Sequence, residues 1–290
     1  MTTRFHPPDL AGIQVRPSRL WTQSLSWILF FVGIALYAQL SIARHKENPD
    51  DRVVPSAQQL IEGVKASVLQ PAEEDDPVDP DASLLQRVQH SMLWKDTMAS
   101  ARRFVIALLL LIPPILLGLH MAVFPYFGAL FQRFVLFFDK IVALSLLPIL
   151  FIAFGIEEWS KIMLMVIGVA PTLILDTCNI ARSVPREQIV KAFTLKSTNF
   201  DVAYRVVLKQ ILPQIINSVR LSLKPLALFL FAGEMIASTD GLAYRIAIMR
   251  RHMGMDIILP YLLWVALLLF LLDALLRFAN RRLHPWYQPL

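Results

Sequence analysis

Three ionisable residues stand inside long apolar stretches of this 290-residue chain and are the first candidates for chemistry: Asp176, Lys224 and Glu234. A charged side chain at the centre of a bilayer costs at least about 2–3 kcal/mol, so such residues usually face protein or water rather than lipid. Asp176 and Lys224 fit either an ion pair that locks two helices or a pathway in which the lysine attracts an anion. We favour the structural role. Glu234 fits either a gate or a helix-end residue.

The sequence lacks the motifs of an enzyme. None of its ten glycines falls in the Gly-x-x-x-x-Gly-Lys-Ser/Thr pattern of a nucleotide-binding loop. Histidines are scattered along the chain, and no His/Cys cluster or Ser/His/Asp set has a supporting context. We therefore expect no catalytic residue, no metal site and no cofactor on this chain.

The composition predicts an integral membrane protein. Hydrophobic residues make up 56% of the chain and charged residues 17%, whereas soluble domains carry about 25% charged residues. A single cysteine, Cys178, excludes an internal disulfide. The net charge of +6 is typical of basic loop ends in a membrane protein, so we expect the lipid bilayer and no nucleic acid as its environment.

Apolar runs predict an all-α membrane protein with about six transmembrane helices. The expected spans are about 20–43, 98–123, 129–155, 161–180, 212–237 and 257–278. Pro113 and Pro114 predict a kink in the second span, because a proline removes a helical hydrogen bond. Several uncharged runs fall short of the ~20 residues that cross a bilayer. A packed bundle with a polar interior is therefore expected.

The basic residues set an orientation. The connection between the fourth and fifth spans carries six lysines and arginines, and short cytoplasmic loops are enriched in such residues. We therefore expect a cytoplasmic N-terminal segment at 1–19, a permanent first helix at 20–43, and a cytoplasmic tail at 281–290. The first apolar run is too long for the core of a cleavable signal peptide.

The segment 44–97 is expected on the periplasmic side. It holds eleven acidic and six basic residues. Residues 55–66 read as an N-capped amphipathic helix with Leu60, Ile61 and Val64 on one face. Residues 71–81 form an acidic, proline-rich loop. The segment is either a solvated insert or a docking surface for a partner.

A polar, basic segment at 183–199 separates the fourth and fifth spans, and we call it the knob. Pro185 suits the first turn of a helix, with Ser183 as a candidate cap. Ile189, Ala192 and Phe193 fall on one helical face. Residues 197–199 break this helix, and a second one restarts at Asp201. By pattern alone, the knob is either a compact cytoplasmic element or an amphipathic loop on the headgroups.

An ordered set of short motifs carries a resemblance to a known family. In chain order they are Pro55-Ser56, Ser100 to Arg103, Leu147 to Gly155, Glu158 to Lys161, Val184 to Glu187, Thr194-Leu195, Arg205 to Leu208, Leu212-Pro213, Arg220, Glu234-Met235, Gly241-Leu242 and Asp273. Over roughly residues 55–286, the chain resembles permease subunits of ATP-binding cassette (ABC) importers of the nitrate, sulfonate, taurine and bicarbonate type.

The resemblance implies a type I importer permease fold, with a permease core at 98–280 and a coupling helix within 183–199. In that family the coupling helix carries a Glu-Ala-Ala-x-x-x-Gly signature and docks on the ATP-binding subunit. The residues expected to serve coupling here are Pro185, Glu187, Val190, Lys191, Ala192, Phe193 and Lys196. Val190, Lys191, Ala192 and Lys196 occupy the four signature positions, so only one alanine is kept. Lys196 in place of glycine must take a strained conformation or change the turn.

The resemblance also implies an assembly in a bacterial inner membrane. A second permease copy or paralogue, two ATP-binding subunits with ATP and Mg, and a periplasmic substrate-binding protein would complete an importer for a small anion or organic acid. Because most of the coupling signature is absent, an alternative remains. The chain would then be a non-transporting homologue that acts as a membrane scaffold or regulatory subunit. A third alternative, an ATP-independent transporter or channel, lacks the internal repeat that such carriers often show.

Overall fold

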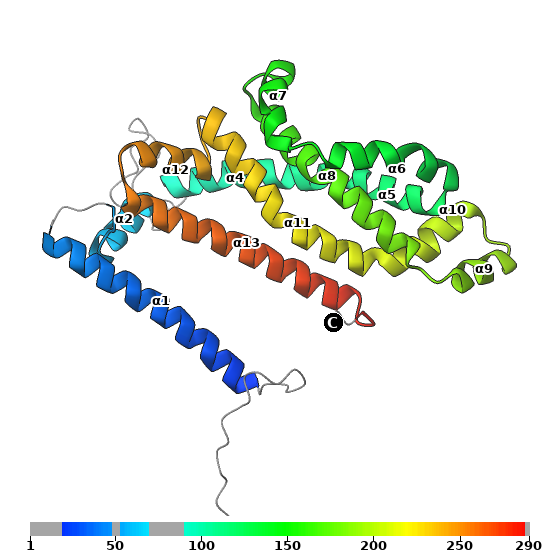
Figure 1. Cartoon of the computed structure of the whole chain (residues 1–290), viewed down its shortest axis with the longest axis horizontal. Helices are drawn as coiled ribbons and strands as arrows, with labels where there is room; N and C mark the ends of the chain where they lie inside the picture. The colour runs from blue at the N-terminus through cyan, green and yellow to red at the C-terminus, as the bar shows by residue number, and fades with distance from the viewer. Residues whose placement is uncertain (1–18, 48–52, 70–89, 288–290) are drawn as a thin grey trace, which may run out of the picture.

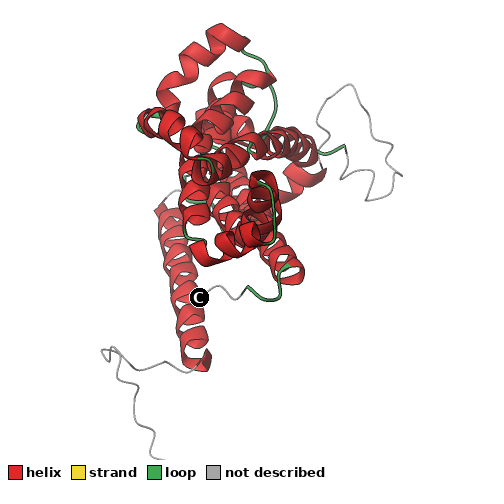
Figure 2. Ribbon diagram, turned by 90° about the vertical axis from the view of Figure 1, so that its right-hand side faces the viewer, coloured by secondary structure: helices red, strands yellow, loops and turns green. Residues whose placement is uncertain are grey.

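The computed structural model describes residues 19–47, 53–69 and 90–287, and these residues form helices and loops without a strand (Figures 1 and 2). Most of the expected segment 1–19 and the acidic loop 71–81 lie outside the described residues. The helices are α1 (Arg19–Glu47), α2 (Ala57–Leu69), α4 (Met92–Leu110), α5 (Ile112–Val123), α6 (Pro125–Asp139), α7 (Leu147–Phe154), α8 (Glu158–Arg182), α9 (Arg186–Thr194), α10 (Asn199–Asp201), α11 (Leu208–Ala237), α12 (Leu242–Arg251) and α13 (Met255–Leu283). A 3-10 turn, η1 (Ala143–Leu146), precedes α7, and a π-helical turn, η2 (Val202–Val207), precedes α11.

Five stretches among the described residues are long and apolar enough to cross a membrane. They are Trp27–Lys46, Met92–Val123, Glu158–Arg182, Asn199–Ala237 and Met255–Leu283. The second of them is divided at Leu111, where α4 ends and α5 begins with prolines in its first turn. The helix is therefore interrupted at Leu111, beside the kink predicted at Pro113 and Pro114.

The expected third span, 129–155, is not one straight helix. It consists of α6 and the η1–α7 pair, which meet at a bend of 86°. The physical reason lies in the sequence between them. Asp139 and Lys140 end α6 as an exposed ion pair, and Pro148 starts a new helix because its ring fits only a first turn. A sixth span exists only if this bent pair crosses as a unit.

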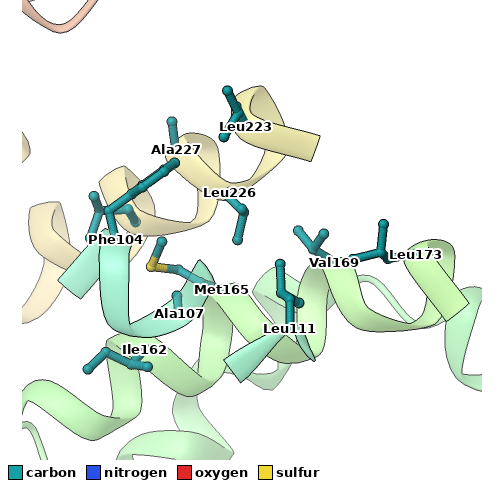
Figure 3. Packing of buried hydrophobic residues seen from close by; sticks show 11 residues of the cluster. Phe104, Ala107, Leu111, Ile162, Met165, Val169, Leu173, Leu223, Leu226 and Ala227 are labelled. Carbon is teal, nitrogen blue, oxygen red and sulfur yellow. The ribbon is translucent and has the colours of Figure 1, made fainter. Parts of the chain in front are cut away.

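The core of the bundle lies where α4, α8 and α11 pack together. Its largest cluster contains Phe104, Ala107, Leu111, Ile162, Met165, Val169, Leu173, Leu223, Leu226, Ala227 and Leu230. Figure 3 shows Met165 of α8 among side chains of α4 and α11, and it is fully buried. Further along α8, Gly118 of α5 comes so close that a Cβ there would lie 2.5 Å from the carbonyl oxygen of Ile174. Helix α8 is therefore the central element.

By contrast, α1 runs apart from the bundle (Figure 1). Only 6% of its membrane window is buried. Its hydrogen bonds to the rest of the chain gather near its C-terminal end, where the hydroxyl of Tyr37 donates to the carbonyl of Pro55 at 2.9 Å. The first span is thus a separate helix tethered at one end.

Helix α2 confirms the N-capped amphipathic helix expected at 55–66. Ser56 and Gln59 form a reciprocal cap, because the Ser56 N–H donates to Gln59 Oε1 and the Gln59 N–H donates to Ser56 Oγ. Gly63 packs against the start of α13, where a Cβ would lie 2.3 Å from the Asp256 carbonyl oxygen. The expected apolar face lines a half-open hollow of about 1090 Å³ between α2, α4 and α13.

Candidate functional site

The knob consists of α9, a tight elbow and the start of the next helix. Helix α9 begins at Arg186, and Pro185 takes the N-cap position without a side-chain cap, so it precedes the first turn instead of lying in it. The proposed cap at Ser183 was wrong, because its hydroxyl donates to the Ile180 carbonyl at 2.7 Å and so belongs to the end of α8. The two helices are therefore joined by a three-residue link.

Lys196 forms the elbow that ends α9. The Lys196 N–H donates to the Phe193 carbonyl at 2.9 Å, and the Ser197 N–H donates to the Ala192 carbonyl at 3.2 Å. These two bonds define a Schellman motif, in which Lys196 occupies the position that glycine usually takes. Its φ of 59° lies in the left-handed region, which costs a residue with a Cβ about 1–2 kcal/mol. The expected strained conformation of Lys196 is thus what the structure has.

Beyond the elbow, the chain re-enters the bundle through a capped helix start. The Asp201 N–H donates to Thr198 Oγ1, and the Thr198 N–H donates to Asp201 Oδ2 in return. The π-helical turn Val202–Val207 follows, and such turns are frequent at functional sites because they interrupt the regular hydrogen-bond ladder. The turn buries Val202 and Val207 against Ala192 of α9. The knob is therefore attached firmly to the base of α11.

One side of α9 is packed and the other is open. Ala192 is buried and Ile189 packs against the same cluster. The six other residues expected to serve coupling are exposed: Pro185, Glu187, Val190, Lys191, Phe193 and Lys196. Val190 and Phe193 keep 59% and 45% of their surface exposed, so α9 presents apolar side chains between basic ones.

The intramembrane candidates occupy different surroundings. Asp176 on α8 and Lys224 on α11 are both exposed on the isolated chain. Within the described part of the chain, they form no ion pair with each other. The reason is their placement: α8 and α11 bury the neighbouring Thr177 and Leu223 and turn the charged residues outward.

Glu234, in contrast, is completely buried near the end of α11. Its Oε1 accepts hydrogen bonds from Ser100 Oγ at 2.7 Å and from Arg103 Nη1 at 2.8 Å. Its Oε2 accepts the backbone N–H of Ala243 at 3.0 Å. Glu234 therefore joins α4, α11 and α12, and it is part of a larger set of charges.

Arg103 is the centre of that set. It is 2% exposed, and its Nε and Nη2 donate to the two carboxylate oxygens of Glu158 at 2.5 and 2.7 Å. The same guanidinium also donates to the carbonyl and to the carboxylate of Asp240. Lys161, which is buried, lies 3.4 Å from Glu158. Arg103 thus ties α4 to the start of α8 and to the link between α11 and α12.

Asp96 extends the network to α12 and α13. It is buried, and it accepts the Gly241 N–H at 3.2 Å, Arg245 Nε at 2.9 Å and the Tyr261 hydroxyl at 3.2 Å. We call the whole set the Arg103 cluster: Asp96, Ser100, Arg103, Glu158, Lys161, Glu234, Asp240 and Arg245. Buried charges are tolerated only when paired and hydrogen-bonded, so this end of the bundle is held in one arrangement.

Comparisons with known proteins identify the family to which these residues belong. Residues 92–287 match the family described as binding-protein-dependent transport system inner membrane component. The chain belongs to this family. It is 29% identical over 203 residues to the taurine transport system permease protein TauC of Escherichia coli K12, covering 70% of this chain and 74% of that protein.

Two further similarities agree with this family assignment. The chain is 27% identical over 143 residues to the putative aliphatic sulfonates transport permease protein SsuC of Escherichia coli K12, covering 49% of this chain and 54% of that protein. A solved structure of the MetNI methionine ABC transporter matches with a TM-score of 0.57 at 17% identity, over 68% of this chain and 97% of that chain. The protein is thus a permease subunit of an ABC transporter with the type I importer fold.

Sequence reasoning found some residues of this permease and missed others. Four motifs that carried the resemblance, at Ser100 to Arg103, Glu158 to Lys161, Glu234 and Gly241, meet in the Arg103 cluster. Arg103 and Asp96 were not predicted to be central. The signal available in the sequence was that Arg103 lies inside the expected span 98–123, where a charged side chain has to pack against protein. No group of three or more metal-ligating side chains occurs in the described ranges.

A second ion set joins the last two long helices of the permease. Arg220 Nε on α11 donates to Asp273 Oδ1 on α13 at 2.7 Å, and Arg277 Nη2 donates to the other oxygen at 2.5 Å. The buried Asn280 adds a hydrogen bond from its amide to the Pro213 carbonyl at 2.9 Å. Helix α13 is therefore fastened to α11 by polar contacts along a length that is otherwise mostly unburied on the isolated chain.

Proposed function

We propose that this permease forms, with a second copy or a paralogue, the translocation path of an importer for a small organic anion. ATP and Mg would bind to two separate ATP-binding subunits, and a periplasmic protein would deliver the substrate. The anion class is supported by the taurine and sulfonate permeases to which the chain is similar. An exposed cation near the middle of α11, Lys224, is the residue of this chain best suited to attract it.

The observation that carries the proposal is the construction of α9. Its outer face combines exposed apolar and basic side chains, and its inner face is anchored by Ala192 to the start of α11. A soluble partner that pushed on this face would move α8 and α11 together, because those helices share the core around Met165 and Leu226. We therefore infer that Pro185, Glu187, Val190, Lys191, Ala192, Phe193 and Lys196 couple the permease to the ATPase.

The Arg103 cluster lies at the other end of the same two helices. Helix α8 runs from Glu158 to Arg182, and 25 residues at 1.5 Å each extend about 37 Å, a full membrane thickness. With the knob in the cytoplasm, the cluster and the link between α11 and α12 lie on the periplasmic side. They would meet the substrate-binding protein there, and both chain termini would be cytoplasmic.

The test is a mild-detergent purification of the tagged full chain from its native membrane, followed by identification of co-purifying subunits and an ATPase assay. We expect an ATP-binding subunit whose retention or hydrolysis drops on Lys191→Glu and on Val190→Asp, since both residues are exposed on α9. Leu283→Asp is the matched control, because Leu283 is 65% exposed at the end of α13, outside the knob. A complex without a nucleotide-binding subunit would refute the proposal and favour a scaffold or channel.

A further inference from the structure

A hollow of about 510 Å³ separates the knob from the bundle. Its walls come from the α5–α6 junction, the end of α8, α9 and the start of the next helix, and they include Phe124, Arg182, Arg186, Ile189, Phe193 and Asn199. This volume lies within the range of small-ligand sites, about 300–1,000 Å³. The hollow lies directly behind the helix assigned to coupling, so an occupant would affect that helix.

Arg182 is held at the edge of the hollow with donors to spare. Its Nη2 donates to Gln132 Oε1 on α6 at 3.0 Å. The guanidinium lies over Gly128, where a Cβ would be 3.5 Å from Nη2. Within the described ranges, Gln132 is its one hydrogen-bond partner. Since arginine has five N–H donors, most remain available to a ligand.

Arg186 supplies a second cation to the same wall. It makes no hydrogen bond or ion pair with the described residues. Its surroundings are strongly basic: residues 182–209 contain six lysines and arginines against Glu187 and Asp201. Asp201 is already engaged by Thr198 and Arg205. Arg182 and Arg186 line the hollow, and no acidic side chain does so among the described residues, so the hollow favours an anionic ligand.

The rest of the wall is apolar and aromatic. Phe124 is in ring contact with His120, Phe127 and Phe200 around the α5–α6 junction. Exposed apolar residues continue from there along α6, among them Leu130 and Phe134. One end of the hollow thus suits a charged group, and its neighbouring surface suits a hydrocarbon chain.

We propose that this hollow binds the phosphate group of an anionic phospholipid from the leaflet on the knob side, with an acyl chain along α6. Basic pockets between transmembrane helices on the cytoplasmic side are suited to such headgroups. Arg182 and Arg186 hold the phosphate. The inference rests on the proposed function of α9 and deepens it. A filled hollow resists compression, so force on α9 passes to α8 and α11 instead of closing the gap.

The experiment uses the complete transporter in nanodiscs of phosphatidylcholine alone or with phosphatidylglycerol. Native mass spectrometry counts retained phosphatidylglycerol, and an ATPase assay follows coupling. We expect phosphatidylglycerol to bind and to raise hydrolysis. Arg182→Gln and Arg186→Gln each weaken its binding about fivefold, the usual contribution of one basic residue at an anionic surface. Lys209→Gln, which removes an exposed charge near the start of α11 outside the hollow, leaves the binding unchanged.

The variants and the added phosphate distinguish a lipid site from a soluble-anion site and from no site. Equal phosphatidylglycerol retention by the double variant Arg182→Gln/Arg186→Gln and by Lys209→Gln refutes the site. If inorganic phosphate in nanodiscs of phosphatidylcholine alone raises hydrolysis as much as phosphatidylglycerol does, and the double variant abolishes this effect, the hollow binds a soluble anion and the lipid is refuted. The subunit composition of the complex is read before any lipid is counted. A failure of the proposed ATP-driven function is thereby distinguished from a failure of the lipid site.

Discussion

Gly241 lies directly against the carboxyl group of Glu234: a Cβ on Gly241 would stand 2.6 Å from Glu234 Cδ and 2.7 Å from each oxygen. The backbone of Gly241 has a φ of 120°, which side chains rarely allow. Its N–H donates to Asp96, while the following N–H groups of Leu242 and Ala243 donate to Ser100 and Glu234. The start of α12 therefore closes over a buried carboxylate, and only glycine permits the approach.

Gly241→Ala is expected to destabilise the permease. The backbone conformation alone costs a non-glycine residue about 1–3 kcal/mol, and the new methyl group displaces a carboxylate that has no free space. The measurement is the thermal unfolding midpoint of the purified complex. Gly33→Ala on α1 is the control, because no atom lies within 4 Å of its Cβ position. An unchanged midpoint for Gly241→Ala would contradict the packing described here.

Arg103→Gln tests the balance of the buried charges. Removing one partner of a buried ion pair costs about 3–5 kcal/mol, because the other charge stays buried and unpaired. Glu234 is the carboxylate left in that position, since Glu158 and Asp240 are partly exposed. We expect the double variant Arg103→Gln/Glu234→Gln to be more stable than Arg103→Gln alone in the same unfolding assay. If the double variant is the less stable of the two, the buried Glu234 carboxylate does not need the charge of Arg103 for its stability.

Lys196→Gly is expected to stabilise the knob. Glycine adopts the left-handed conformation of the elbow without the cost of about 1–2 kcal/mol that lysine bears. The matched control is Lys191→Gly, within α9, where glycine costs about 1 kcal/mol of helix stability. Hydrogen exchange at the amides of Ser197 and Lys196 reports the elbow directly. Faster exchange in Lys196→Gly than in the unaltered chain would show that the lysine side chain supports the turn.

Local patterns predicted much of this permease, and long-range pairing accounts for what they missed. Prolines and caps placed α2, the break at Leu111 and the knob, since those features depend on neighbours in sequence. The third span is divided into two helices rather than one, because apolar content hid the bend that follows Asp139 and Lys140. Arg103 and Glu234 are 131 residues apart, and no periodicity reveals such a pair. For Lys196, the motif position left two alternatives, a strained conformation or a changed turn, and the structure has the strained conformation.

Lys224→Met separates the two roles left open for the exposed intramembrane lysine. Two unit charges 4 Å apart attract each other by about 1 kcal/mol even in bulk water, so a pathway lysine changes the apparent affinity for an anion at least about fivefold. We expect Lys224→Met to assemble normally, to keep basal ATP hydrolysis, and to lose uptake of an organic sulfonate in proteoliposomes with the binding protein.

Lys224→Arg is the companion variant, since it preserves the charge at a site whose neighbours in the described chain provide no ion pair. Uptake is expected to persist in Lys224→Arg at a reduced rate. If Lys224→Met instead prevents assembly while Lys224→Arg restores it, the lysine pairs with a carboxylate of the second permease subunit. The pathway role would then fall to other residues, because a cation neutralised across the dimer interface no longer attracts a translocating anion.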